Sequence, residues 1–244
     1  MYTNRKFKAR EIALTVCFTA LYAIFSFLPI SPIIGLPGKA ITAAAIMAPI
    51  MGIFLGPYLG ILSTILGGII GFFAGSFSPP SFISGVIAAS CAGMLYTGKR
   101  SLCAFAYFSL LFLFSFYPFV GPVWLYLPLM WFQIVGFLLL ISPLQSSAVK
   151  SLNSGNNSNN LQAFFIISLT STLAGQIAGS LTFELLSWPI FLADMKAWEI
   201  YWRGLTILYP VERTIIALIA SFMGAALYKV LKSANLVQFL NRAV

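Results

Sequence analysis

Residues 40–77 read AITAAAIMAPIMGIFLGPYLGILSTILGGIIGFFAGSF, a stretch of 38 residues without a charged side chain. A membrane-spanning helix needs about 20 predominantly apolar residues, so this stretch is long enough for two spans. The pair Gly56–Pro57 divides it near the middle, and proline breaks or kinks a helix because it lacks a backbone N–H. We therefore expect two membrane-spanning helices here, at 40–56 and 58–77.

The rest of the chain has the same apolar character. Only 8% of its 244 residues are charged, whereas 60% are hydrophobic. A soluble domain contains about 25% charged residues, so this composition predicts an integral membrane protein. Apolar stretches of about span length occur at 12–30, 40–56, 58–77, 82–97, 101–117, 123–141, 161–183 and 211–231. The expected fold class is all-α, a polytopic transmembrane helix bundle with about eight spans.

We expect a single integral membrane domain over 1–244. Its expected parts are an N-terminal four-helix half (1–100), an extra helical pair (101–142), a flexible polar loop (143–160) and C-terminal helices (161–244). The loop is expected because it contains the low-complexity run SLNSGNNSNN. For the extra pair, two full spans and a re-entrant pair both remain open, since Pro128 kinks the second segment.

The charged residues predict the orientation. With the N-terminus inside, the cytoplasmic segments contain ten of the 14 basic residues, and the outer segments contain four of the five acidic ones. Cytoplasmic loops of membrane proteins carry an excess of Lys and Arg. Both termini are therefore expected in the cytoplasm, in a multi-pass protein of the cell membrane. The net charge of +9 then reflects topology and lipid headgroups and indicates no nucleic-acid partner.

Residue types that are missing exclude several kinds of chemistry. The chain has no histidine, so His-based catalysis and His-ligated metals are excluded. The three cysteines form no C-x-x-C pair, and no acidic residue lies in the middle of a span. We expect no enzyme activity, no metal and no cofactor. The phosphate-binding sequence G-x-x-x-x-G-K-[ST] is also missing, so an ATP-driven role requires a separate ATPase.

Glycines recur at intervals of four in the stretch quoted first. Gly67, Gly71 and Gly75 lie on one face of the second expected helix. Small residues at this spacing let neighbouring helices approach closely in lipid. The track serves either packing within the bundle or contact with another subunit, and the spacing alone does not separate the two.

The pattern resembles a known family. The run IIGLPGKAITAAAIMAPIMGIFLGPYLGILSTILGGIIGFFAG, then PPSFISGVIAASCAGMLYTGKR and the ending PVERTIIALIASFMGAALYKVLK, resemble the substrate-binding S components of energy-coupling factor (ECF) importers. The G-P-x-x-G feature of that family matches Gly56-Pro57-Tyr58-Leu59-Gly60. The likeness covers about residues 8–100 and 162–233 and leaves 101–142 as an addition to the usual six helices.

The resemblance implies a membrane-embedded binder of a vitamin or other micronutrient. Such a subunit associates with a transmembrane T subunit and two cytoplasmic ATPases. The family contacts its T subunit through an Ala-x-x-x-Ala track on the first helix, which matches Ala9 and Ala13 here, with Cys17 extending the small face. The first three helices are then the expected partner surface, with Gly67 and Gly71 included.

Polar and aromatic side chains on the expected outer side are candidates for binding a small planar ligand. They lie in the first outer loop, 31–39, and in the segment 184–213, with one amide inside a span. The predicted ligand-binding residues are Lys39, Gln176, Glu184, Trp198, Trp202, Arg203 and Glu212. The alternatives are an aromatic belt at the membrane surface, a favourable acid at a helix N-terminus and an amide that bridges helices.

Three functions remain open. The first is the substrate-capture subunit of an ATP-driven importer. The second is a stand-alone secondary transporter or channel for a small solute, which usually needs coupling residues near the membrane midplane. The third is a structural or assembly protein of the membrane.

Overall fold

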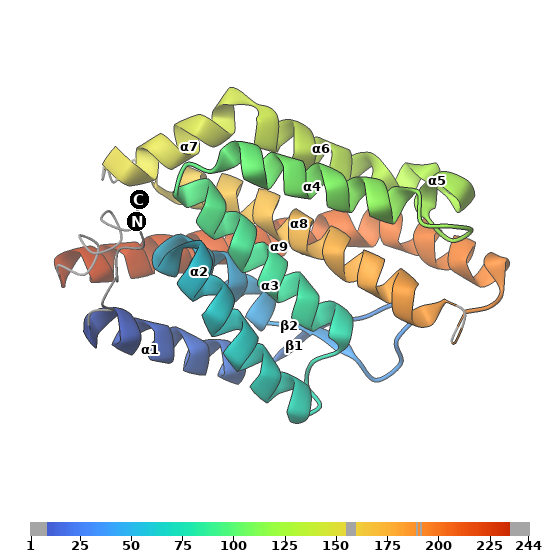
Figure 1. Ribbon diagram of the computed structural model, residues 1–244, viewed down its shortest axis with the longest axis horizontal. Helices are drawn as coiled ribbons and strands as arrows, with labels where there is room; N and C mark the ends of the chain where they lie inside the picture. Colours follow the sequence, from blue (N-terminus) through green and yellow to red (C-terminus); the bar gives the residue numbers. More distant parts are fainter. Residues whose placement is uncertain (1–8, 155–159, 189, 191, 235–244) are drawn as a thin grey trace, which may run out of the picture.

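A computed structural model gives the architecture of residues 9–154, 160–188, 190 and 192–234 (Figure 1). Its elements are α1 (Ala9–Phe25), β1 (Pro29–Pro32), β2 (Ala40–Thr42), α2 (Ala44–Phe73), α3 (Pro79–Tyr96), α4 (Arg100–Ser115), α5 (Pro122–Leu125), the 3₁₀ helix η1 (Leu127–Met130), α6 (Trp131–Ile141), α7 (Pro143–Ser154), α8 (Asn160–Ser187) and α9 (Met195–Ser233). The predicted helical bundle is present. A short antiparallel pair of strands is its one addition within the described residues.

Helix α8 is the central element of the bundle. It packs against α2, α3, α4, α6, α7 and α9. In Figure 1, α4, α6 and α7 lie above it, and α1 and α2 lie below it. From residue 163 to 180, every side chain except that of Phe165 is buried. The many Ser, Thr, Gly and Ala residues of α8 permit this close packing from all sides.

Several helices are long and apolar enough to cross a membrane, as expected of a membrane protein. Within the described residues these are α2, α3, α8 and α9, and the bent pair α6–α7 is a fifth if it counts as one span. The two helices of that pair meet at 61°. The start of α1 and the end of α9 lie at the same end of the long axis (Figure 1). The number of eight spans and the cytoplasmic location of the termini stay predictions.

The predicted break at Gly56–Pro57 is confirmed. Gly56 has φ 74° and ψ 179°, a conformation that only glycine adopts without strain. A Cβ placed on Gly60 would lie 3.1 Å from the Cα of Gly52, whereas residues eight apart in a straight helix are separated by about 12 Å. The two arms of α2 therefore fold back on each other at Gly56.

The loop at 31–39, which was expected on the outer side, is part of a β-hairpin and not a plain turn. Strands β1 and β2 pair in antiparallel fashion, with Ser31 opposite Ile41 and Pro32 opposite Ala40. Pairing satisfies backbone N–H and C=O groups that would otherwise need water. The hairpin holds this loop close to the ends of the helices.

The prediction of a flexible polar loop over 143–160 is wrong for residues 143–154, which form α7. Ala148 and Leu152 are buried, and α7 packs on α8, so this polar helix has an apolar side. Arg100 donates hydrogen bonds to the carbonyls of Leu140 and Ser142 and to the hydroxyl of Ser146, which stabilises the corner between α6 and α7. The remaining loop residues, 155–159, lie outside the described residues.

Two further boundaries differ from the prediction. The apolar segment 123–141 is divided into α5, η1 and α6. Pro122 and Pro128 stand in the first turns of α5 and η1, where a missing backbone N–H costs no hydrogen bond. The segment 184–210, which lies between the last two predicted spans, belongs to two helices. Its first residues complete α8, and α9 is continuous from Met195 to Ser233 with Pro210 inside it. Asp194 starts α9 by accepting a hydrogen bond from the N–H of Lys196 at 2.9 Å, as an N-cap does.

Candidate functional site

A cavity lies beneath the hairpin, between α3, α8 and α9. It contains about 770 Å³ of empty space, its open side included. Ile33, Ile34 and Ile41 of the hairpin and Phe77 before α3 line it, with Phe183 of α8. The lining is therefore mainly apolar on the hairpin side.

Polar side chains enter the cavity from three helices. Helix α3 contributes the hydroxyls of Ser81 and Ser84, α8 contributes Gln176 with small hydroxyl side chains near it, and α9 contributes Tyr209 and Arg213. Gln176 is only 3% exposed, and neither its Oε1 nor its Nε2 has a hydrogen-bond partner in the described part of the chain. A buried amide without partners is costly, and this one faces the empty space. It is the residue best placed to bind a ligand.

Arg213 is the charged residue among those that line the cavity. Its side chain is 6% exposed, and its Nη2 lies 3.3 Å from Oε1 of Glu212. Its Nε has no partner among the described residues. A guanidinium offers five N–H donors, so this ion pair leaves donors of Arg213 available on the cavity side.

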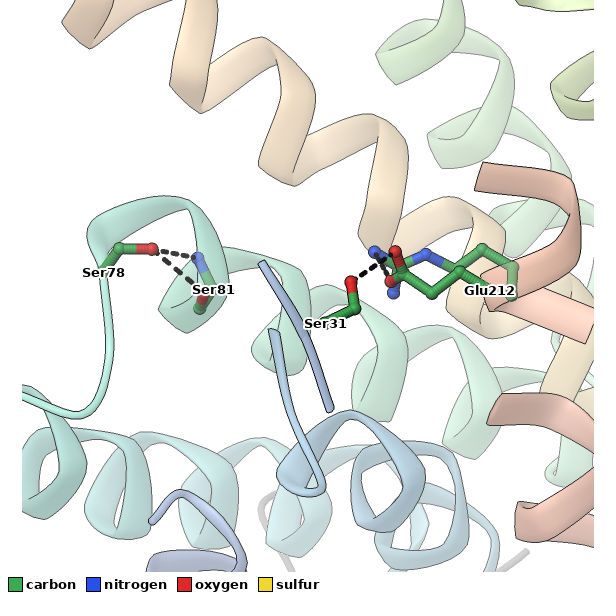
Figure 2. A network of polar contacts seen from close by, with 5 residues as sticks. Ser31, Ser78, Ser81 and Glu212 are labelled. Carbon is green, nitrogen blue, oxygen red and sulfur yellow. Dashed lines mark hydrogen bonds and ion pairs between the residues drawn. The ribbon is translucent and has the colours of Figure 1, made fainter. Parts of the chain in front are cut away.

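Glu212 connects α9 to the hairpin. The hydroxyl of Ser31 in β1 donates to its Oε2 at 3.0 Å. Figure 2 shows Ser31 between Glu212 on one side and Ser78 and Ser81, at the start of α3, on the other. Ser78 caps α3 by accepting a hydrogen bond from the N–H of Ser81 at 3.4 Å. The contact between Ser31 and Glu212 fixes the strand at the cavity in relation to α9.

The other end of the hairpin is fixed by Lys39 and Gly35. The ammonium of Lys39 donates to the carbonyl of Gly75 at 2.8 Å. Gly35 has φ 90°, and a Cβ there would lie 2.6 Å from Cζ of Phe183. The hairpin therefore contacts α8 closely at a position where only glycine fits.

The α3–α8 wall of the cavity depends on close packing of small residues. A Cβ on Gly175 would lie 2.5 Å from the carbonyl oxygen of Ser84, and one on Gly179 would lie 3.1 Å from that of Pro80. A Cβ on Gly85 would overlap the hydroxyl of Tyr22 from α1. These glycines bring three helices together behind the cavity and serve packing within the bundle.

Of the predicted ligand-binding residues, Gln176 lines the cavity, and Glu212 lies behind it through its pair with Arg213. Lys39 contacts Gly75 outside the cavity. Glu184 is fully buried, and neither carboxylate oxygen has a partner in the described residues, but it does not line the cavity.

Trp198, Trp202 and Arg203, also predicted to bind the ligand, do not line the cavity, and their role in binding stays a prediction. Both indoles are fully buried in an aromatic cluster with Phe183 and Phe114. Trp202 donates to the carbonyl of Val120 at 2.7 Å. The side chain of Arg203 is 63% exposed and pairs with Glu199 one turn away. The two indoles pack in the core, and the guanidinium of Arg203 forms an ion pair on the surface.

The predicted partner surface is divided by the structure. Ala9, Ala13 and Cys17 lie on the exposed side of α1, where a partner could contact them. Gly67 and Gly71 are buried against α1 instead: a Cβ on Gly67 would lie 2.9 Å from the carbonyl oxygen of Thr19, and one on Gly71 2.8 Å from Oγ of Ser26. Their small size serves packing of α1 on α2, and their contact with a partner stays a prediction.

The cavity residues that sequence reasoning missed are Arg213, Tyr209, Tyr22 and the hydroxyls of α3 and α8. A spacing of four signals part of this set, since Leu205, Tyr209 and Arg213 share one face of α9. That spacing is informative only if the helix continues through Pro210. No cluster of metal-ligating side chains occurs in the residues that the structure describes.

Comparison with protein-family models, with curated proteins and with solved structures found no match. The functional argument therefore rests on the residues and geometry of the cavity.

Proposed function

We propose that this chain is the substrate-capture subunit of an ATP-driven importer, which takes a small vitamin-like ligand from the outer face of the cell membrane. The ligand binds beneath the β1–β2 hairpin. A transmembrane T subunit and two cytoplasmic ATPases supply the energy for release to the inside. The sequence resemblance to S components supports this proposal, and so does the location of the cavity.

The observation that carries the proposal is the pairing of an apolar cavity with a few buried polar groups. Small-molecule sites are usually concave and apolar, with a small number of polar side chains that orient the ligand. Gln176 and Arg213 have hydrogen-bonding atoms without partners at this cavity within the described residues. The hairpin covers the cavity at the end of the bundle that the charge distribution predicts to be outside.

The exposed small residues of α1 suit the docking of a T subunit. Ala9, Ala13 and Cys17 lie on one side of the helix, and small side chains permit close helix–helix contact in lipid. In this proposal the ligand and the partner bind at separate places, the ligand beneath the hairpin and the partner on α1.

Co-purification tests the proposal. The chain, expressed with candidate T and ATPase subunits, is expected to form a complex that takes up solute into proteoliposomes only with ATP. The variant Ala13→Leu should reduce recovery of the complex without changing ligand retention, and Ile24→Leu, at another exposed position of α1, is the matched control. Uptake by the isolated chain without ATPases would contradict the proposal.

A stand-alone secondary transporter is the second candidate, and Glu184 favours it. An acidic side chain buried without a partner in a membrane protein often takes part in ion coupling. A coupled transporter would accumulate solute when a proton or sodium gradient is applied to proteoliposomes containing this chain alone, and Glu184→Gln would abolish that accumulation. If the wild-type chain alone accumulates no more solute with a gradient than without one, this candidate is excluded.

A further inference from the structure

The cavity has a polar end and an apolar end, and the helix register shows where each lies. Phe183 contacts Trp202 through their rings, and a Cβ on Gly224 would lie 2.6 Å from the ring of Phe164. Helices α8 and α9 are thus antiparallel, and Gln176 is level with about residues 209–212. Arg213 lies within about one turn of that level.

The opposite end of the cavity is apolar and aromatic. Phe183 lies seven residues from Gln176 on α8, which is about 10 Å along the helix. Leu205 lies eight residues from Arg213 on α9, and the hairpin isoleucines complete this end. A ligand that reaches both ends is a compact apolar body of about 10 Å with one polar group.

The polar end has more hydrogen-bond donors than acceptors. Arg213 supplies guanidinium N–H groups, including an Nε that has no partner in the described residues, and Gln176 supplies an unpaired NH₂ group beside one unpaired carbonyl oxygen. Among the described residues that line the cavity, none is acidic. Glu212 compensates part of the positive charge, but one of its oxygens accepts from Ser31 and it lies behind the cavity wall.

From this arrangement we propose that the cavity selects a small monocarboxylate, whose carboxylate is bound by Arg213 and Gln176 and whose apolar or aromatic body points toward Phe183 and the hairpin. The inference rests on the proposed substrate-capture function and specifies its ligand class. Guanidinium groups bind carboxylates through two parallel hydrogen bonds. A cationic ligand would meet Arg213 without a compensating acid in the lining.

The test uses three probes that share one body and differ only in the polar group: 3-phenylpropanoate, 3-phenylpropanamide and 3-phenylpropylammonium. Each is titrated calorimetrically into the purified full chain in nanodiscs at neutral pH. Charge-assisted hydrogen bonds are about twice as strong as neutral ones, so the carboxylate is expected to bind at least tenfold more tightly than either other probe. If it does not, whether by weak binding or by no binding, the proposal is overturned.

Three variants assign the effect to residues. Gln176→Glu is nearly isosteric and places a negative charge at the polar end, so it should weaken carboxylate binding about tenfold and strengthen binding of the ammonium probe. Arg213→Lys keeps the charge but loses the planar fork, and a loss of several-fold is expected. Arg203→Lys is the matched control on the exposed part of α9, and it should change nothing. Unchanged probe preference in Gln176→Glu overturns the proposal even if the wild type prefers the carboxylate.

The probe titration does not involve a T subunit or an ATPase. Carboxylate selectivity without complex formation therefore supports this inference and contradicts the importer proposal. If the chain works in an ATP-driven importer but, when isolated, prefers the amide or the ammonium probe, the importer proposal is supported and the carboxylate inference is contradicted.

Discussion

Helix α9 carries two arginine–glutamate pairs in different surroundings. Arg203 and Glu199 are 63% and 38% exposed, on a surface turn of the helix. Arg213 and Glu212, ten residues further on, are 6% and 5% exposed, at the cavity. The same pair of residue types is a solvent-exposed ion pair in one region and a buried ion pair with unpaired atoms in the other. Residue type alone does not identify the site, because burial decides what the charges do.

The largest expected difference is in stability. Removing one partner of a buried ion pair leaves an uncompensated charge, which costs about 3–5 kcal/mol. Arg213→Met should therefore lower the free energy of unfolding in micelles by about 3 kcal/mol, and adding Glu212→Gln should restore much of the loss. Arg203→Met should cost less than about 1 kcal/mol. Equal costs at the two arginines would contradict the comparison.

The contrast between buried and exposed positions extends to the small residues. Gly67→Leu would force a side chain into the backbone of α1, which lies 2.9 Å from the position of a Cβ. Overpacking of this kind costs about 1–3 kcal/mol, so the unfolding midpoint of Gly67→Leu should fall. Ala13→Leu, on the exposed side of α1, should leave the midpoint unchanged. A fall in both would show that Ala13 is also a packing residue.

A smaller difference is expected for two tryptophans. The indole N–H of Trp202 donates to a buried carbonyl at 2.7 Å, whereas that of Trp124 lies 3.4 Å from its acceptor at an exposed position. Trp202→Phe should cost about 1 kcal/mol of unfolding free energy, because it leaves the carbonyl of Val120 unpaired. Trp124→Phe should cost less than about 0.5 kcal/mol. Loss of probe binding in Trp202→Phe at unchanged stability would return this residue to the site.

The smallest expected effect concerns the attachment of the hairpin. Ser31 bonds to the buried Glu212, and Lys39 bonds to the exposed carbonyl of Gly75. Ser31→Ala should remove about 1 kcal/mol, and amide hydrogen exchange in 31–42 should speed up about fivefold. Lys39→Met should speed it up less, since solvent replaces an exposed bond. Faster amide exchange in Lys39→Met than in Ser31→Ala would show that the Lys39 contact holds the hairpin more strongly than the Ser31 contact.

The sequence predicts the helical class and the break at Gly56 because apolar length and a Gly–Pro pair act locally. It also predicts that Gln176 is special, since an amide within a span needs a partner or a ligand. It does not predict which residues of α9 face inward, because Pro210 and several charges make 184–210 resemble a loop. Trp198 and Trp202 illustrate the same limit: aromatic residues at a membrane surface and aromatic residues in a core have the same composition and spacing.

The contact between Lys39 and Gly75 has a consequence for topology. Lys39 precedes α2 and Gly75 follows it, and their Nζ and O atoms are 2.8 Å apart. A straight helix of 30 residues would hold its ends about 45 Å apart. If the arms of α2 enter a membrane, the segment contributes an even number of crossings, because the chain leaves it close to the point where it entered. The chain would then be on the same side of the membrane before and after α2, whether its two arms cross the whole bilayer or only half of it. An experiment that shows on which side the β1–β2 hairpin lies would also show on which side the turn before α3 lies.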